Sequence, residues 1–305
     1  MAETLSDLDG RETYEEGVDL LLGRETARDV RRAALRFAAA IELGHAGAAE
    51  ILACLTASAA LGPSDWPRAF EYMRRAAALG SSRAQRQLRL LATPDGRIDL
   101  AFWFSAPDRE VVCEAPRIRF SKHFVPTWVG DWLIEHARGR LSAGTMYSGT
   151  TRSVGVEASR RCSDYQYEIL NADLVLMLVR ERIAALTRLP VAAMEPPRIF
   201  HYALGEEIKP HYDRLTDGPS ATGEQSKGDR IATFLLYLND DYDGGELAFP
   251  KVGLSRKGAQ GDALYFTHID AAGRPDRLSL HAGLPITRGE KWVFSQWIHD
   301  RPFVE

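Results

Sequence analysis

Residues 230–250 read RIATFLLYLNDDYDGGELAFP, in which a long apolar run is followed by a cluster of Asp and Gly and then by a shorter apolar run. This is the pattern of two short strands joined by a turn. Apolar runs of the same kind recur from Pro197 to the end of the chain, at residues 198–202, 231–238, 246–249, 263–267, 278–281 and 292–298. Short strands at this density predict a sandwich or barrel such as a jelly roll.

Two helices and two further strands are expected ahead of this β region. Residues 98–104 and 116–120 have strand-like apolar content, and residues 124–140 carry aromatic and apolar side chains at helical spacing. Residues 172–186 predict a second helix with a broad apolar face. We expect the two helices to cover one face of the strands.

The N-terminal part differs in composition. Residues 12–92 are rich in Ala, Leu, Arg and Glu, which indicates helices. The stretch AAIELGHAGAAEIL begins at Ala39 and AAALGSSRAQRQL at Ala76, and Gly44 aligns with Gly80 at an offset of 36 residues. A period of this length predicts helical hairpins stacked as a short solenoid, with each Gly at a helix end.

This segment resembles the Sel1-like branch of the tetratricopeptide repeats, with about two copies. The fold class expected for the chain is α+β. A helical repeat domain would occupy residues 1–92, and a jelly-roll core with flanking helices would occupy residues 97–305. The repeats either bind a partner or simply pack on the second domain, and both possibilities stay open.

Composition and charge exclude several classes of protein. The chain has 305 residues, and its 38 Lys and Arg against 42 Asp and Glu give a formal net charge of −4. The chain lacks the excess of basic residues that would predict nucleic-acid binding. The apolar run 174–179 is too short for a membrane span, and the acidic N-terminus does not resemble a signal peptide. Three scattered cysteines, Cys54, Cys113 and Cys162, favour a reducing compartment, the cytoplasm.

The motif HYD at residues 211–213 is the first candidate for chemistry. Alternate side chains of a strand share a face, so we expect His211 and Asp213 to point the same way. With His281 from another strand they would form a 2-His-1-carboxylate triad, which leaves metal positions open. A second H-x-D, HID at residues 268–270, lies in a loop-like stretch and is followed by few histidines. The expected metal ligands are therefore His211, Asp213 and His281.

Lys291 lies ten residues after His281, beyond the turn signal TRGE at residues 287–290. We expect two antiparallel strands here, with Lys291 and Trp297 on one face. A buried ammonium is costly unless it is paired, and the distal carboxylate of 2-oxoglutarate would be such a partner. A lysine that protects a strand edge is the alternative.

Three stretches together resemble the prolyl 4-hydroxylase type of 2-oxoglutarate- and Fe(II)-dependent dioxygenases. They are HYALGEEIKPHYD (201–213), RIATFLLYLNDDYDGGELAFP (230–250), and GDALYF (261–266) followed by LHAGLPITRGEKWVFSQWI (280–298). The resemblance implies Fe(II), 2-oxoglutarate and O₂, with ascorbate as a further candidate cofactor. It also implies hydroxylation of an unactivated C–H bond, with succinate and CO₂ as co-products.

The same resemblance implies roles for single residues. The triad would bind Fe(II) and Lys291 would pair with the distal carboxylate, while Tyr202 would hydrogen-bond the co-substrate. Arg230 and Trp297 would line the substrate side, and no catalytic side chain is expected beyond the metal site. Two positions depart from the family's pattern, because Ile208 replaces a Tyr and Leu247 replaces a Thr.

Several functions stay open at this point. The expected substrate is a prolyl residue in a protein or peptide that the repeats would recruit. A small molecule or another residue type is the alternative within this class. From other classes, the chain could be a repeat-based interaction protein with a degenerate barrel, or a hydrolase with Zn(II) at the same three ligands. The complete triad argues against the first, and Lys291 argues against the second. The oligomeric state does not follow from the sequence.

Overall fold

The computed structural model describes residues 5–24, 26–143, 146–147, 154–155, 162–214 and 228–303. The chain divides into a helical unit, residues 1–104 and 168–180, and a β unit, residues 105–167 and 181–305. The helices are α1 (Leu5–Leu22), α2 (Val30–Glu42), α3 (Ala46–Ala57), α4 (Trp66–Ala78), α5 (Ser82–Leu91), α6 (Leu100–Phe104), α7 (Thr127–Ala137) and α8 (Leu174–Thr187). The domain boundaries expected from the sequence stay a prediction.

The helical unit repeats its local structure at the spacing found in the sequence. Before α2 and α4, Asp29 and Asp65 each accept a hydrogen bond from the backbone N–H three residues later, at 2.9 and 3.0 Å. After the same helices, Gly44 and Gly80 have φ angles of +91° and +95°, which only glycine adopts readily. Both pairs are 36 residues apart. The Sel1-like resemblance stays a prediction.

Small side chains allow the helices of this unit to approach closely. The alanines that recur at the repeat spacing are all inaccessible to solvent: Ala33, Ala69, Ala40, Ala76, Ala48 and Ala84. A larger side chain at any of these positions would overpack the helix contacts.

The expected strand at residues 98–104 is wrong. Residues Leu100–Phe104 form the short helix α6, and the side chain of Asp99 accepts a hydrogen bond from the Phe102 N–H at 3.0 Å. This helix-capping contact outweighs the strand preference of the aromatic residues. Next to it, only Ile98 has strand character, as an isolated bridge to Ala92.

The β unit contains the strands expected from Pro197 onward, except the one expected at residues 278–281, where a 3₁₀ turn precedes a strand that begins only at His281. It also contains several short strands besides. The strands are β1 (Glu110–Cys113), β2 (Ile118–Ser121), β3 (Ser142–Ala143), β4 (Met146–Tyr147), β5 (Val154–Gly155), β6 (Ser163–Gln166), β7 (Arg198–Tyr202), β8 (Ile208–His211), β9 (Arg230–Tyr237), β10 (Asp243–Gly244), β11 (Leu247–Phe249), β12 (Leu254–Arg256), β13 (Ala263–Thr267), β14 (His281–Gly283), β15 (Ile286–Arg288) and β16 (Lys291–His299).

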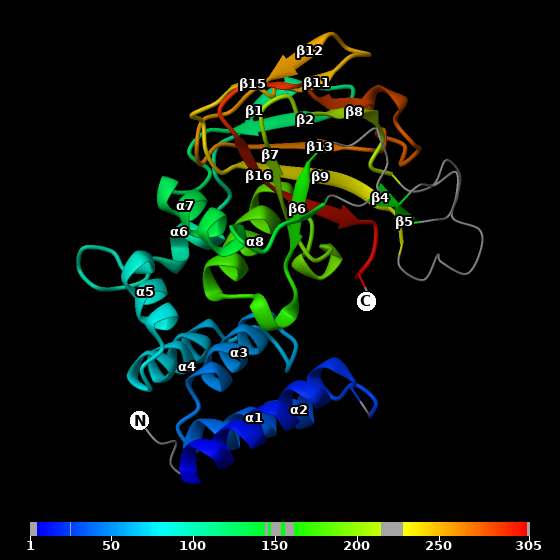
Figure 1. Ribbon diagram of the computed structural model, residues 1–305. Helices are drawn as coiled ribbons and strands as arrows, with labels where there is room; N and C mark the ends of the chain where they lie inside the picture. Colours follow the sequence, from blue (N-terminus) through cyan, green and yellow to red (C-terminus); the bar gives the residue numbers. More distant parts are fainter. Residues whose placement is uncertain are drawn as a thin grey trace. The chain divides into compact units, whose positions relative to one another are not determined.

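Two antiparallel sheets form the layers of this unit. The large sheet has the order β1-β2-β13-β9-β16-β7-β6-β3, and the small sheet has the order β12-β11-β14-β8 (Figure 1). Apolar side chains from both sheets meet between them, in one cluster around Phe249 and Phe266 and another around Ile208 and Val293. This arrangement confirms the expected α+β class with a jelly-roll type of core. Among the described strands, no pairing closes the two sheets into one barrel.

The segment between His281 and Lys291 differs from the expected hairpin. Residues 277–279 form a 3₁₀ turn, and His281 begins β14 in the small sheet. Lys291 begins β16 in the large sheet, and β15 between them pairs with β10. The chain thus crosses from one sheet to the other between His281 and Lys291.

Helix α7 packs on the large sheet through a glycine. A Cβ built on Gly130 would lie 2.4 Å from the carbonyl oxygen of Leu238, just beyond β9, so no side chain fits there. None of the three cysteines is in a disulfide bond. In the part of the chain that the structure describes, no helix combines the length and the apolar character that a membrane crossing requires.

Candidate active site

His211, Asp213 and His281 come together as the sequence predicts. His211 ends β8 and His281 begins β14, and the two residues are direct partners in the small sheet. Their rings therefore lie side by side, with centroids 4.3 Å apart. Asp213 follows two residues after His211, and the ligand atoms of all three side chains lie within 4.8 Å of one another. Asp213 and His281 are buried, and His211 is partly exposed.

Backbone carbonyls fix the proton on each imidazole. The Nδ1 of His211 lies 2.8 Å from the carbonyl oxygen of Lys209, and the Nδ1 of His281 lies 3.0 Å from that of Ser279. A carbonyl only accepts, so both Nδ1 atoms carry a hydrogen, and in the neutral form of each ring the lone pair is on Nε2. These Nε2 atoms lie 3.4 and 3.5 Å from the two carboxylate oxygens of Asp213.

The electrostatics keep His281 and Asp213 in the form that binds metal. Burial, with the neighbouring His211, lowers the pKa of His281 to about 3, so this imidazole is neutral at pH 7. Burial raises the pKa of Asp213, but His281 and His211 outweigh it and hold the pKa well below its usual range. Two imidazoles and one carboxylate are the donor set of a mononuclear Fe(II) site with open positions. The residues present therefore fit such a metal.

Lys291 is the buried cation that the sequence predicts. Lys291 on β16 lies opposite Tyr202 on the neighbouring strand β7, and 5% of its surface is exposed. Its Nζ donates a hydrogen bond to the carbonyl of Gly245 at 2.6 Å. Burial lowers its pKa to about 8, while Glu246 acts in the opposite direction. An ammonium has three donors, so an anion can satisfy those that this carbonyl leaves.

Two buried tyrosines beside Lys291 were not expected from the sequence. The hydroxyls of Tyr237 and Tyr242 are inaccessible and have no hydrogen-bond partner among the described residues. The Nζ of Lys291 lies 5.9 Å from the ring centre of Tyr237 and 5.3 Å from that of Tyr202. The Tyr237 hydroxyl is therefore available, beside Lys291, to donate a hydrogen bond to a carboxylate. In the sequence, the signal for Tyr237 is its position four residues after Thr233 in an apolar strand. An even spacing places both side chains on the same face.

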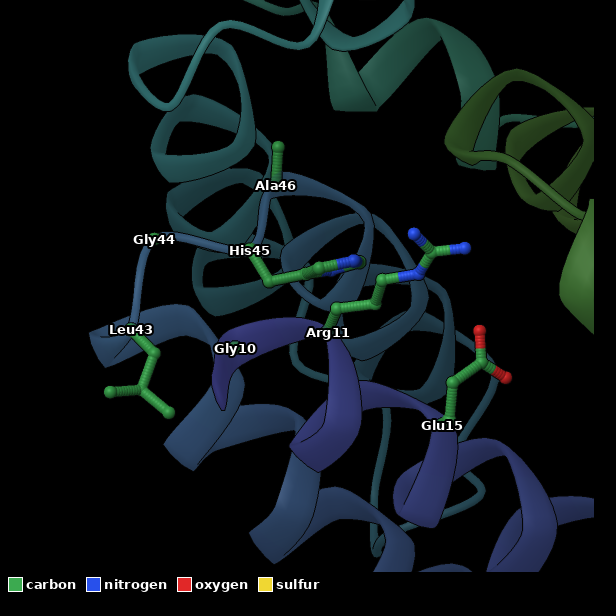
Figure 2. Close-up of a pocket in the computed structure, with 7 residues that line it drawn as sticks. All are labelled: Gly10, Arg11, Glu15, Leu43, Gly44, His45 and Ala46. Carbon is green, nitrogen blue, oxygen red and sulfur yellow. The ribbon is translucent and has the colours of Figure 1, made fainter. Parts of the chain in front are cut away.

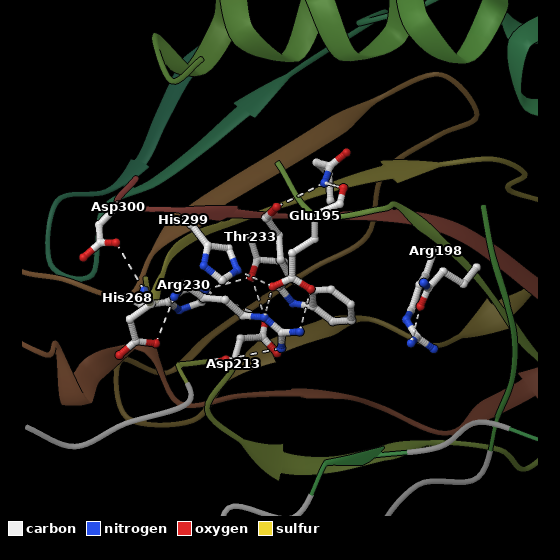
Figure 3. A network of polar contacts seen from close by, with 12 residues as sticks. Glu195, Arg198, Asp213, Arg230, Thr233, His268, His299 and Asp300 are labelled. Carbon is white, nitrogen blue, oxygen red and sulfur yellow. Dashed lines mark hydrogen bonds and ion pairs between the residues drawn. The ribbon is translucent and has the colours of Figure 1, made fainter. Parts of the chain in front are cut away.

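Arg230 and Trp297 also lie together, next to Asp213. The guanidinium of Arg230 stacks 3.9 Å from the ring centre of Trp297 and pairs with Glu195 at 2.6 and 2.9 Å. Its Nη1 lies 3.4 Å from the backbone oxygen of Asp213 (Figure 3). Although burial raises it, the pKa of Glu195 is lowered to about 2 by hydrogen bonds from His299 and Arg230. Arg230 is thus rigidly held, and its substrate role stays a prediction.

The second H-x-D does not form a metal site with its own carboxylate. Asp270 instead forms an ion pair with Arg274 at 2.8 Å, and the Arg274 side chain is strongly exposed. His268 instead is buried and lies 2.8 Å from the Thr233 hydroxyl, on the side of Asp213. The two departures from the family's pattern, Ile208 and Leu247, are buried in the apolar clusters between the sheets.

A separate pocket lies in the helical unit. It has a volume of about 290 Å³ and is lined by Gly10, Arg11, Glu15, Leu43, Gly44, His45 and Ala46 (Figure 2). His45 stacks on Tyr14 at 4.1 Å, and its Nδ1 accepts a hydrogen bond from the Ala48 N–H at the start of α3. The imidazole is therefore a helix cap here.

Comparison with known proteins gives a consistent result. Residues 197–299 match the model of the 2OG-Fe(II) oxygenase superfamily, a segment that contains the triad and Lys291. The chain is 31% identical over 206 residues to probable prolyl 4-hydroxylase 6 of Arabidopsis thaliana, which covers 62% of this chain and 70% of the relative. It is also 31% identical over 224 residues to prolyl 4-hydroxylase subunit alpha-1 of Rattus norvegicus.

The rat match covers 71% of this chain but only 41% of the relative, so the chain spans less than half the length of that subunit. Among solved structures, the viral collagen prolyl hydroxylase of Paramecium Bursaria Chlorella virus-1, in complex with 2-oxoglutarate, aligns with a TM-score of 0.48 and 23% identity. That alignment covers 61% of this chain and 98% of the viral one.

Proposed function

Because this chain belongs to the prolyl 4-hydroxylase family of 2-oxoglutarate- and Fe(II)-dependent oxygenases, we propose that its β unit hydroxylates a prolyl residue in a protein or peptide. The observation that carries this proposal is the convergence of His211, Asp213 and His281, with both Nε2 atoms directed at one carboxylate.

Each group of the site has a task in this activity. His211, Asp213 and His281 would hold Fe(II), and the ammonium of Lys291 would pair with the distal carboxylate of 2-oxoglutarate. The bound iron and co-substrate supply the activation of O₂ and the oxidation of the C–H bond, with succinate and CO₂ as co-products. The buried position of Lys291 and Tyr237 excludes water from the carboxylate end, so the ion pair there is strong.

Mass spectrometry of a cell lysate tests the activity and the substrate class together. The lysate is incubated with enzyme, Fe(II), 2-oxoglutarate and O₂, and peptides that gain one oxygen atom are identified. The proposal predicts oxidised prolyl residues, absent with His211→Ala and present with Lys122→Ala, which changes an exposed residue. Oxidation confined to other residue types would refute a prolyl substrate but keep the oxygenase.

We also propose that the repeated helices of the helical unit recruit the protein substrate. Support comes from Leu35 on α2, which is 72% exposed, more than any other large apolar side chain in the described part of the chain. The test compares KM for a full-length substrate and for its isolated target peptide, in the original chain and in Leu35→Asp. Recruitment predicts a higher KM for the full-length substrate alone. Equal KM values for both chains would overturn this surface as the recruiting one.

A further inference from the structure

A buried chain of hydrogen bonds lies behind Asp213. The Oγ1 of Thr233, on β9, is 2.6 Å from the Oδ2 of Asp213 and 2.8 Å from the Nε2 of His268. Asp213 is 6% exposed, Thr233 2% and His268 1%, so water does not compete for these contacts. Figure 3 shows them next to the Arg230–Glu195 pair.

The direction of each hydrogen bond follows from the chemistry of the groups. A carboxylate only accepts, so the Thr233 hydroxyl gives its single hydrogen to Asp213. The hydroxyl oxygen must then accept from His268, whose Nε2 carries the hydrogen. The Nδ1 of the neutral His268 ring then carries no hydrogen, and it has no hydrogen-bond partner in the described part of the chain. One tautomer of His268 therefore completes the chain.

The backbone holds both residues firmly in place. Thr233 lies in the middle of the large sheet, opposite Phe266 on one neighbouring strand and Trp297 on the other. His268 donates its backbone N–H to the carbonyl of Ile231 at 2.8 Å and accepts from the N–H of Asp276 at 2.8 Å. The sheet thus fixes the backbone of both residues, and the two hydrogen bonds of the Thr233 hydroxyl hold their side chains.

Packing alone does not account for an imidazole at this position. A buried polar atom without a partner costs about 1–3 kcal/mol, and the Nδ1 of His268 is such an atom. An apolar side chain next to Phe266 would avoid that cost. The hydrogen bond from Nε2 to Thr233 offsets it and orders the hydroxyl toward Asp213.

We infer that Thr233 and His268 are positioning residues, which fix the rotation of the Asp213 carboxylate so that it faces the Nε2 atoms of His211 and His281 before the metal binds. The inference rests on the proposed function for the identity of the metal site. Groups that orient a metal-binding carboxylate typically change metal affinity 10- to 100-fold when they are removed.

Calorimetric titration with Co(II), without 2-oxoglutarate, measures this effect independently of turnover. Thr233→Val removes the hydroxyl at constant volume, and we expect metal affinity to fall about tenfold or more. Thr233→Ser keeps the hydroxyl and should restore most of the affinity. His268→Leu should also weaken binding, and His268→Gln, which keeps an N–H at a similar reach, should bind more tightly than His268→Leu.

Thr56→Val is the matched control, because Thr56 is a buried threonine in α3 whose hydroxyl bonds only to its own helix at Leu52. Its metal affinity should equal that of the original chain. Visible absorption of bound Co(II) gives a second readout, since a rotated carboxylate changes the ligand field and a merely destabilised chain does not. Circular dichroism identifies any variant that fails to fold.

The outcomes separate this inference from the proposed function. If the original chain binds no Co(II), the metal site itself is refuted. If it binds, and Thr233→Val and His268→Leu match it within twofold with unchanged spectra, the positioning role is overturned. If Thr233→Val does not fold, equal affinities of His268→Leu and His268→Gln overturn the role of His268 by themselves.

Discussion

Lys291 shows how burial sets the working range of a single side chain. Its pKa is lowered to about 8 by burial, so the ammonium is largely intact at pH 7 and is lost as the pH rises through about 8. We predict that affinity for 2-oxoglutarate falls roughly tenfold for each pH unit above about 8, measured by calorimetry on the metal-loaded protein.

Lys291→Arg is the control for this pH dependence, because a guanidinium stays charged throughout the range. Its affinity should be flat between about pH 7 and 9.5, even if it is lower in absolute terms. Stability changes in the opposite direction. The unfolded chain binds more protons than the folded one between about pH 8 and 10.5, so this group raises stability as the pH rises there. A flat profile in the original chain would contradict the assignment of Lys291.

Local sequence patterns predicted that His211, Asp213 and His281 come together, but not the residues that support them. The spacing of His211 and Asp213 within a strand is a local signal, and so is a lone histidine in a strand-like run. Thr233 and His268 reach Asp213 only because three segments of the chain meet in the folded state. No periodicity reports such a contact. In the sequence, His268 instead begins a separate H-x-D motif.

At the level of elements, long apolar runs predicted strands well and short mixed ones were missed. Strands β9, β13 and β16 lie within about one residue of their expected bounds. Strand β8 reads IKPH, and neither its Pro nor its Lys favours a strand in the sequence. The sheet supplies its pairing through β14, where His211 lies opposite His281.

The contact of α7 with the large sheet gives a prediction at this scale. In a helix interior, Gly→Ala normally stabilises by about 1 kcal/mol. At Gly130 the added methyl group would meet the Leu238 carbonyl at 2.4 Å, and such overpacking costs about 1–3 kcal/mol. We expect Gly130→Ala to lower the free energy of unfolding, measured with urea.

Gly47→Ala in α3 is the matched control, since the nearest atom to its new Cβ would be the end of the His45 side chain at 3.2 Å. The imidazole caps α3, but it needs to give by only a few tenths of an ångström, so the loss of stability should be smaller than in Gly130→Ala. Equal effects of Gly130→Ala and Gly47→Ala would show that the α7 contact does not constrain the β unit.

At the scale of the whole molecule, the two units are not two consecutive stretches of the chain. The helical unit includes residues 168–180, where Asp173 pairs with Arg83 at 3.1 Å and Leu174 donates its N–H to Gln87 at 3.1 Å. Such long-range polar contacts leave no trace in composition. The difference between helical and β composition was enough to predict two kinds of structure.

Ligand binding should stabilise the two units differently. A ligand at 100 times its Kd adds about 2.7 kcal/mol to the stability of the unit that binds it. We predict that Co(II) with 2-oxoglutarate raises the Tm of the β unit in calorimetry and leaves that of the helical unit unchanged, and that EDTA reverses the shift. An equal shift in His211→Ala would place the binding elsewhere.

The most direct test of the central claim, that His211, Asp213 and His281 form the iron centre of a prolyl hydroxylase, is the stoichiometry of succinate to hydroxylated prolyl residue. The purified protein is incubated with Fe(II), 2-oxoglutarate, O₂ and a prolyl peptide identified from the lysate. The account predicts one succinate for each oxygen atom gained by the peptide, and neither product with folded His211→Ala. Peptide oxidation without succinate, or undiminished turnover in His211→Ala, would contradict it.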